Sequence, residues 1–192
     1  MASLGVNYIG YEQDRYIFRH QDIEDIPIGK SVALIGGVQD NLGYRTPYLG
    51  GRLRYGDYFS FGYLAADVQL GGFLTQKRNK QTTLRWEFTY FSPLFNIGQW
   101  HFRQFVKWRS VVGLSRKDYV KDRISLNGST GIIGFNSPTL TGIHKSILTL
   151  QTQSYSPFAL WGFRVSPFLM GDIGFIGNDN RNLLKDQVLT KV

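Results

Sequence analysis

The chain has 192 residues and a formal net charge of +8 at pH 7. This length suits one domain, and no linker or shift in composition divides it. Cysteine is absent, which excludes a disulfide framework and a thiolate metal site. The apolar runs are far shorter than a membrane-spanning helix requires, so no such helix is expected. The 14 Phe, 11 Tyr, 4 Trp and 22 Gly favour strands and turns over a helical bundle.

Several segments alternate between apolar and polar residues or are bounded by turn residues, and they are predicted to be β-strands. In chain order these are Arg15–His20, Ser31–Val38, Tyr48–Tyr55, Tyr58–Gly71, Gln81–Phe91, Gln99–Gly113, His144–Tyr155 and Trp161–Asp172.

The connections between the predicted strands alternate in length. Compact turns are expected at Gly56–Asp57, Ser92–Gly98 and Ser156–Leu160, and long polar loops at Gln39–Pro47, Gly72–Lys80 and Leu114–Ile143. Short turns at one end and long loops at the other are typical of outer-membrane barrels.

The clearest pattern is the strict alternation in Gln81–Phe91, where Trp86 and Phe88 oppose Arg85 and Glu87. Trp100–Val111 repeats it. Over all predicted strands, the cations share one face: Arg52, Arg54, Arg85, Arg103, Lys107, Arg109, Lys145 and Arg164. The other face is predicted to hold Leu53, Leu64, Val68, Leu84, Trp86, Trp108, Leu148, Leu150, Phe163 and Val165.

This separation has two interpretations. Arg or Lys facing lipid at the bilayer midplane costs roughly 2–4 kcal/mol each, so a membrane barrel must direct them inward. A soluble barrel would show the same periodicity with its apolar face inside. The lengths of Tyr58–Gly71 and Gln99–Gly113 exceed the usual length of soluble strands and favour the membrane interpretation.

Longer motifs carry a family resemblance. They are ISLNGSTGIIGFNSPTLTG, HKSILTLQTQSYSP and WGFRVSPFLMGDIGFIG, with DRYIFRHQDIEDIPIG and YFSPLFNIGQWHFRQFV upstream. Together they resemble the outer-membrane transporter superfamily of the barrel-assembly insertase and the two-partner-secretion translocators, also called bacterial surface antigens. The resemblance runs from about Asp14 to Gly177 and corresponds to the later half of the family's barrel.

The resemblance implies a role in the insertion or translocation of polypeptides at the bacterial outer membrane. It implies membrane lipid and client polypeptides as partners, no enzymatic activity and no cofactor. It also implies a periplasmic domain before the barrel, which the given chain does not contain. The expected fold is therefore an all-β, antiparallel transmembrane β-barrel. Residues 1–177 would form about eight strands of a larger barrel, incomplete at both ends, with a lumen loop at 114–143. Residues 178–192 would be a polar tail, possible remnants of final strands.

In the family, the long loop folds into the lumen, and its Arg-Gly-Phe or Arg-Gly-Tyr motif meets acids of the barrel wall. The matching residues here are Gly131, Ile132, Ile133, Gly134 and Phe135, with Gln151 and Asp172 at the wall positions. Ile133 stands in place of the arginine, and Gln151 in place of a glutamate. An enclosed carboxylate without its cation is costly, so the two departures fit each other. We expect the loop to pack through Ile133 and Phe135 without an ion pair. Ile133→Arg with Gln151→Glu should then stabilise more than either change alone.

Other chemistry is weakly indicated. His20, His101 and His144 lack metal-ligand spacing, and no nucleophile, phosphate-loop or dinucleotide motif occurs. Nucleic acid is not an expected partner, because the aromatic residues lie opposite the cations instead of among them. Two alternatives remain. One is a passive anion-selective channel with a basic lumen formed by Arg52, Arg54, Arg85, Arg103, Lys107 and Arg109. The other is a soluble ligand-binding β-barrel.

Overall fold

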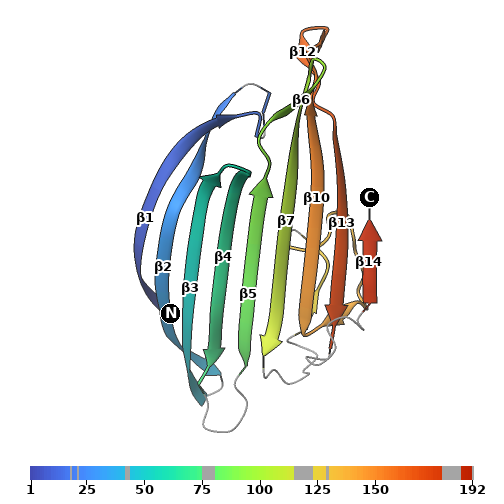
Figure 1. Cartoon of the computed structure of the whole chain (residues 1–192). Coiled ribbons are helices and arrows are strands. Elements are labelled where there is room, and N and C mark those ends of the chain that lie inside the picture. Colours follow the sequence, from blue (N-terminus) through green and yellow to red (C-terminus); the bar gives the residue numbers. More distant parts are fainter. Residues whose placement is uncertain are drawn as a thin grey trace.

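The computed structural model describes residues 1–17, 19–20, 22–41, 44–74, 81–114, 123–128, 130–178 and 187–191. These residues form β-strands, turns and loops (Figure 1). Among them, no helix is long and apolar enough to cross a membrane. The strands are β1 (Ala2–Arg15), β2 (Ile23–Asn41), β3 (Tyr44–Phe59), β4 (Gly62–Phe73), β5 (Thr82–Phe91), β6 (Phe95–Ile97), β7 (Trp100–Leu114), β8 (Ile124–Ser125), β9 (Thr141–Gly142), β10 (His144–Tyr155), β11 (Ala159–Leu160), β12 (Phe163–Arg164), β13 (Phe168–Gly177) and β14 (Gln187–Lys191).

One antiparallel sheet dominates the structure. Its order is β1-β2-β3-β4-β5-β7-β10-β13-β14, and β6 pairs with the start of β7. Each long strand therefore lies beside the next long strand in the chain, as in a meander. The prediction of an all-β antiparallel fold is confirmed. The sheet is open, because β1 and β14 are its two edges and do not pair with each other.

Several predicted boundaries are wrong near the start of the chain. Residues 2–13, for which no strand was predicted, belong to β1, whereas residues 16–20 of the predicted first strand form bends where they are described. The turn expected at Gly56–Asp57 lies instead at Ser60 and Phe61. Gly62 follows this turn with a φ of 126°, which a glycine adopts without steric cost.

The predicted loop lengths are confirmed only in part. In place of the expected loop Gln39–Pro47, β2 and β3 continue until Asn41 pairs with Tyr44. The loop expected at Gly72–Lys80 begins only after Phe73, and residues 75–80 lie outside the described residues. The connection between β7 and β10 is long, as predicted, and its described part begins at residue 123.

The predicted strand Trp161–Asp172 is confirmed only for Phe168–Asp172, which belong to β13. A small hairpin of β11 and β12 precedes β13, with Trp161 at a φ of 50° and Gly162 at 82° in its turn. Successive residues with positive φ are typical of tight hairpin turns. Phe163, Arg164 and Val165 thus lie outside the main sheet, and their predicted places on its two faces are wrong. In the tail, residues 187–191 form β14 and pair with β13.

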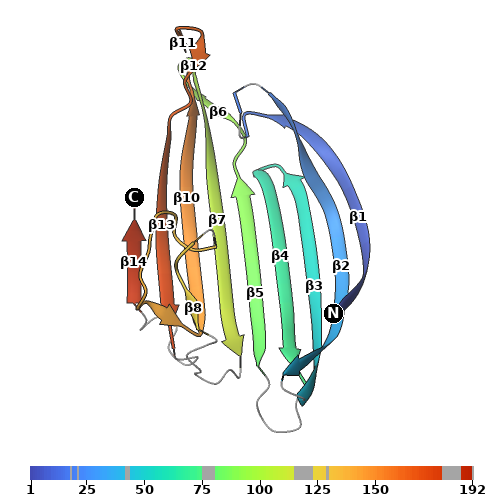
Figure 2. The ribbon, with the colours of Figure 1, turned by 180° about the vertical axis from the view of Figure 1, so that it is seen from behind.

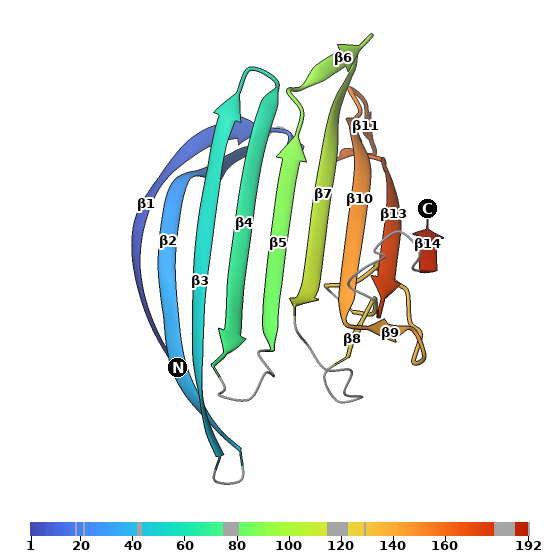
Figure 3. The same cartoon turned by 60° about the horizontal axis from the view of Figure 1, so that its bottom comes forward.

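The sheet is curved, with β1 as one of its edges, and the segment carrying β8 and β9 lies on its concave side (Figures 2 and 3). Two buried clusters form on that side. One consists of Ile17, Ile26, Tyr63 and Phe91 and is called the turn core here. The other consists of Leu126, Ile132, Ile147 and Ile176 and is called the loop core. The concave side is therefore filled at two places by chain segments that are not part of the main sheet.

Candidate functional site

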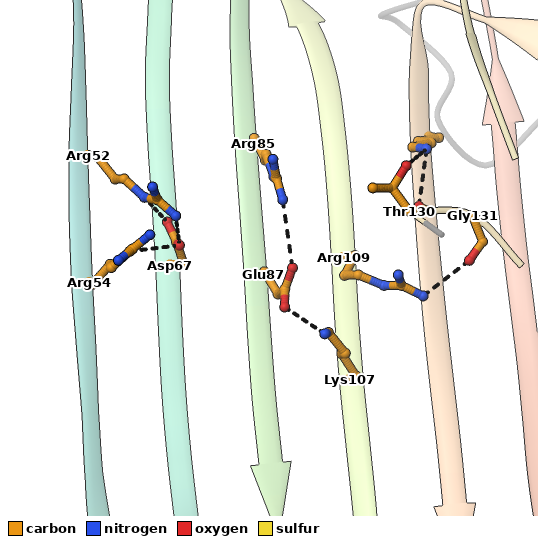
Figure 4. A network of polar contacts seen from close by, with 10 residues as sticks. Arg52, Arg54, Asp67, Arg85, Glu87, Lys107, Arg109, Thr130 and Gly131 are labelled. Atoms are coloured by element: carbon orange, nitrogen blue, oxygen red, sulfur yellow. Dashed lines mark hydrogen bonds and ion pairs between the residues drawn. The ribbon is translucent and has the colours of Figure 1, made fainter. Parts of the chain in front are cut away.

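Strand alternation places the charged side chains on the concave face. In the register, Arg54 lies beside Asp67, Asp67 beside Glu87, and Glu87 beside Arg109. Figure 4 shows this network across β3, β4, β5 and β7. We call the six residues Arg52, Arg54, Asp67, Arg85, Glu87 and Lys107 the charge ladder.

Each carboxylate of the charge ladder is shared between two cations. Asp67 accepts hydrogen bonds from Nε of Arg52 at 3.0 Å and from Nε of Arg54 at 3.1 Å. Glu87 lies 2.8 Å from Nζ of Lys107 and 3.9 Å from the guanidinium of Arg85. Four of the six predicted lumen cations, Arg52, Arg54, Arg85 and Lys107, are thus brought together in ion pairs that sequence periodicity alone could not assign.

Two further cations of the wall bind the backbone of the loop between β7 and β10. Nζ of Lys145 donates to the carbonyl oxygens of Ser125 at 3.0 Å and Thr130 at 3.2 Å. Arg109 donates to the carbonyl oxygen of Gly131 at 3.2 Å (Figure 4). In the resembled family, a loop cation meets wall acids. Here the cations stand on the wall and the loop supplies neutral acceptors.

Apolar side chains complete the attachment of the loop. Leu126 and Ile132 are fully buried in the loop core, and Phe135 packs against its edge. The expectation that Ile133 packs in the same way is wrong, since 60% of its surface is exposed. Its neighbour Ile132 takes that place.

The predicted wall partners lie on β10 and β13, and their hydrogen bonds run to the wall itself. Nε2 of Gln151 donates to Gln153 at 3.2 Å. Asp172 is buried and accepts a hydrogen bond from the hydroxyl of Thr149. Gln151 and Asp172 therefore lie in the paired strands of the wall, and the coupling of Ile133 with Gln151 stays a prediction.

At the other end of the concave face, the turn between β1 and β2 reaches across the sheet. Arg103 on β7 is 3% exposed and donates to Asp14 on β1 at 2.8 Å. Its guanidinium also donates to the carbonyl oxygen of Arg15 and lies 5.0 Å from the ring centre of Phe91. Tyr58 donates to the same carboxylate at 3.1 Å. The alternation of the sequence places Arg103 on the correct face, but it does not identify Asp14 or Tyr58 as members of this contact.

Two further contacts fix this turn to β10 and to the residue that follows it. The hydroxyl of Tyr155 donates to the carbonyl oxygen of Ile17 at 3.2 Å, and Nε2 of His20 donates to that of Ser156 at 2.9 Å. Nδ1 of His20 is buried and has no hydrogen-bond partner among the described residues. Burial lowers the pKa of His20, and the charges of Arg164 and His101 lower it further.

A cavity of about 260 Å³ lies on the concave face between the charge ladder and the turn core. Its charged side includes Arg54, Asp67 and Glu87, and its apolar side includes Ile28 and Tyr63. In this cavity, cations, carboxylates and apolar side chains face the same open space.

The convex face has the opposite character. Leu4, Val6, Leu34 and Leu53 expose between 56% and 81% of their surface. Further along the sheet, Trp108 stacks on Phe88 and exposes 42% of its own surface. The predicted separation of apolar and charged residues is thus present, and the apolar side chains are those exposed on the outside of the curve.

No protein-family model, no curated protein and no solved structure matches this chain.

Proposed function

We propose that this chain forms the wall of an outer-membrane β-barrel of the surface-antigen superfamily. It would take part in the insertion or translocation of polypeptides at the bacterial outer membrane. The observation that carries the proposal is the opposite character of the two faces, with apolar side chains exposed on the convex face and charges on the concave face.

A hydrophobic solvent around the sheet accounts for this arrangement. Monomeric soluble proteins rarely expose a contiguous apolar patch larger than a few hundred Å². Here the apolar side chains of the convex face continue from Val6 through Val32, Leu53 and Val68 to Trp86 on neighbouring strands. Lipid chains would cover such a face at no cost, and a soluble barrel would direct it inward.

The transport part of the proposal rests on the resemblance and on the loop. A long loop packed against the concave wall would occupy part of a lumen, as the resemblance implies. The loop is held by Lys145, Arg109 and the loop core. A loop held by side chains and not by a sheet could move without unfolding the wall.

One observation favours a second candidate, a passive anion-selective channel. The charge ladder has four cations and two carboxylates, so its net charge is 4 − 2 = +2. A lumen with surplus positive charge favours anions. Single-channel recording separates the candidates: a large, steady, anion-selective conductance supports the channel, and a small, flickering one supports a lumen partly filled by its loop.

Two experiments test the main proposal. Urea-washed outer membranes should retain the protein, whereas recovery in the soluble fraction would contradict the membrane location and favour the soluble ligand-binding barrel. Purified protein in liposomes should then accelerate the insertion of an unfolded reporter barrel protein over empty liposomes. Equal rates in the two preparations would contradict the insertion role, and a translocation assay with an unfolded passenger would remain as the test of transport.

A further inference from the structure

The cavity on the concave face is lined by one cross-strand row of small residues. Gly29 pairs with Gly56, Gly56 with Ala65, and Ala65 with Thr89 on four neighbouring strands. All four residues line the cavity. Larger side chains stand on either side of the row, and the charge ladder and the turn core bound the cavity.

The electrostatic character of the cavity follows from the ion pairs around it. The two carboxylates at its charged side, Asp67 and Glu87, are each shared by two cations. The charged side chains that line the cavity itself are Lys30, Arg54, Asp67 and Glu87. The cations Arg52, Arg85 and Lys107 pair with the same carboxylates from outside the lining, so the charge ladder as a whole carries a positive surplus that attracts an anion.

Arg54 offers the donors. Its Nε donates to Asp67, and its two terminal amino groups make none of the hydrogen bonds recorded among the described residues. Its side chain is 50% exposed and lines the cavity. The arginine fork matches a carboxylate, which it can bind through two parallel hydrogen bonds.

The opposite side of the cavity is apolar. Ile28 packs against the turn core, and Tyr63 is buried with its hydroxyl bonded to the carbonyl oxygen of Pro27 at 2.7 Å. Tyr63 therefore turns only its ring toward a ligand. Tyr63 pairs with Tyr58 on β3. Arg54 and Tyr58 are four residues apart on this strand, which corresponds to about 13 Å.

We infer that this cavity binds a small carboxylate-bearing ligand with an apolar body, its carboxylate on Arg54 and its body against Ile28 and Tyr63. The inference rests on the proposed function only in that it assigns a ligand to the concave face, which would be the lumen of the barrel. The binding geometry itself needs no membrane. A bare inorganic anion would satisfy Arg54 and leave the apolar wall facing water.

The test uses the full chain refolded in detergent micelles, with 3-phenylpropionate as the probe and isothermal titration calorimetry as the readout. The uncharged 3-phenylpropionamide is the matched ligand control. Arg54→Gln should weaken binding by about tenfold or more, because a charge-assisted pair is lost. Arg54→Lys should retain part of the affinity. Arg45→Gln, on the same strand but exposed and paired with Asp40, should bind as the wild type does.

Saturable binding of the acid but not the amide, lost in Arg54→Gln and kept in Arg45→Gln, is the expected result. Absence of saturable binding to the wild type would overturn the inference. So would equal binding of the amide, equal binding of inorganic phosphate, or an unchanged affinity in Arg54→Gln. Each of these failures leaves membrane fractionation and reporter insertion unaffected, so it is distinct from a failure of the proposed function.

Discussion

Asp14 on β1 and Arg103 on β7 form a hydrogen-bonded ion pair at 2.8 Å although β2, β3, β4 and β5 separate their strands in the sheet. Five strand spacings in a flat sheet would place them about 24 Å apart. The pair therefore records how strongly the sheet curls at this end. The turn between β1 and β2 bridges the concave face there, while β1 and β14 remain unpaired edges.

Removing Arg103 should destabilise the protein because it leaves the Asp14 carboxylate without its cation. The side chain of Arg103 is 3% exposed and that of Asp14 is 26% exposed. We expect Arg103→Met to lower the free energy of unfolding by about 3 kcal/mol, which urea titration in micelles would measure. Asp14→Asn added to Arg103→Met should recover part of the loss.

Arg45→Met provides the control for this change. The side chains of Arg45 and its partner Asp40 are 80% and 56% exposed. Its loss should cost less than about 1 kcal/mol, as for other exposed pairs. Equal costs for Arg45→Met and Arg103→Met would show that the pair across the concave face contributes no special stability.

Acidification should loosen the turn between β1 and β2. The pKa of His20 is lowered in the folded protein by burial and by the charges of Arg164 and His101, partly offset by Asp22. The unfolded turn binds a proton at the ordinary pKa of about 6.5, so the docked turn is fully stabilised above that pH. Stability is lost as the pH falls below 6.5 toward the folded pKa.

Hydrogen exchange of the turn, corrected for intrinsic rates, measures this effect at pH 7.5 and pH 5.5. His20→Gln keeps a donor for the carbonyl oxygen of Ser156 but cannot titrate, so its exchange should lose the pH dependence. His144→Gln, at the start of β10, should retain it. The same pH dependence in His20→Gln and in the wild type would rule out His20 as the source.

Lys145→Met should release the loop from the wall. Lys145 is 9% exposed, and its ammonium donates to acceptors on Ser125 and Thr130. Hydrogen bonds from a charged donor contribute about 2 kcal/mol, so exchange at residues 124–128 and 130–132 should become much faster. Lys107→Met is the matched control because its partner Glu87 belongs to the wall. Slow exchange of the loop in Lys145→Met would mean that Arg109 and the loop core hold it without Lys145.

The faces of the strands were predictable, and the contacts across the concave face were not. Alternation around Trp86 and Trp108 assigned both faces because each residue in a strand points opposite to its neighbour. The pairs of Arg103 with Asp14 and of Lys145 with Ser125 join residues 89 and 20 positions apart in the sequence. They depend on sheet curvature and loop path, which no local pattern encodes. Ile133 illustrates the limit, because the loop's turn decides whether it or Ile132 is buried.

Gly174 tests the fit of the loop core against the wall. A Cβ at this position would lie 2.6 Å from Cδ1 of Ile132 and 3.3 Å from Cδ1 of Leu126. The larger Gly174→Val change should push both side chains off β13 and cost about 1–3 kcal/mol through overpacking. Gly36→Val is the matched control on β2, since a Cβ there meets no atom within 4 Å. Gly174→Val should lower the free energy of unfolding in urea and speed the hydrogen exchange of Ile132. Gly36→Val should resemble the wild type in both measurements. Unchanged protection of Ile132 in Gly174→Val would mean that the loop does not rest on the wall at this glycine.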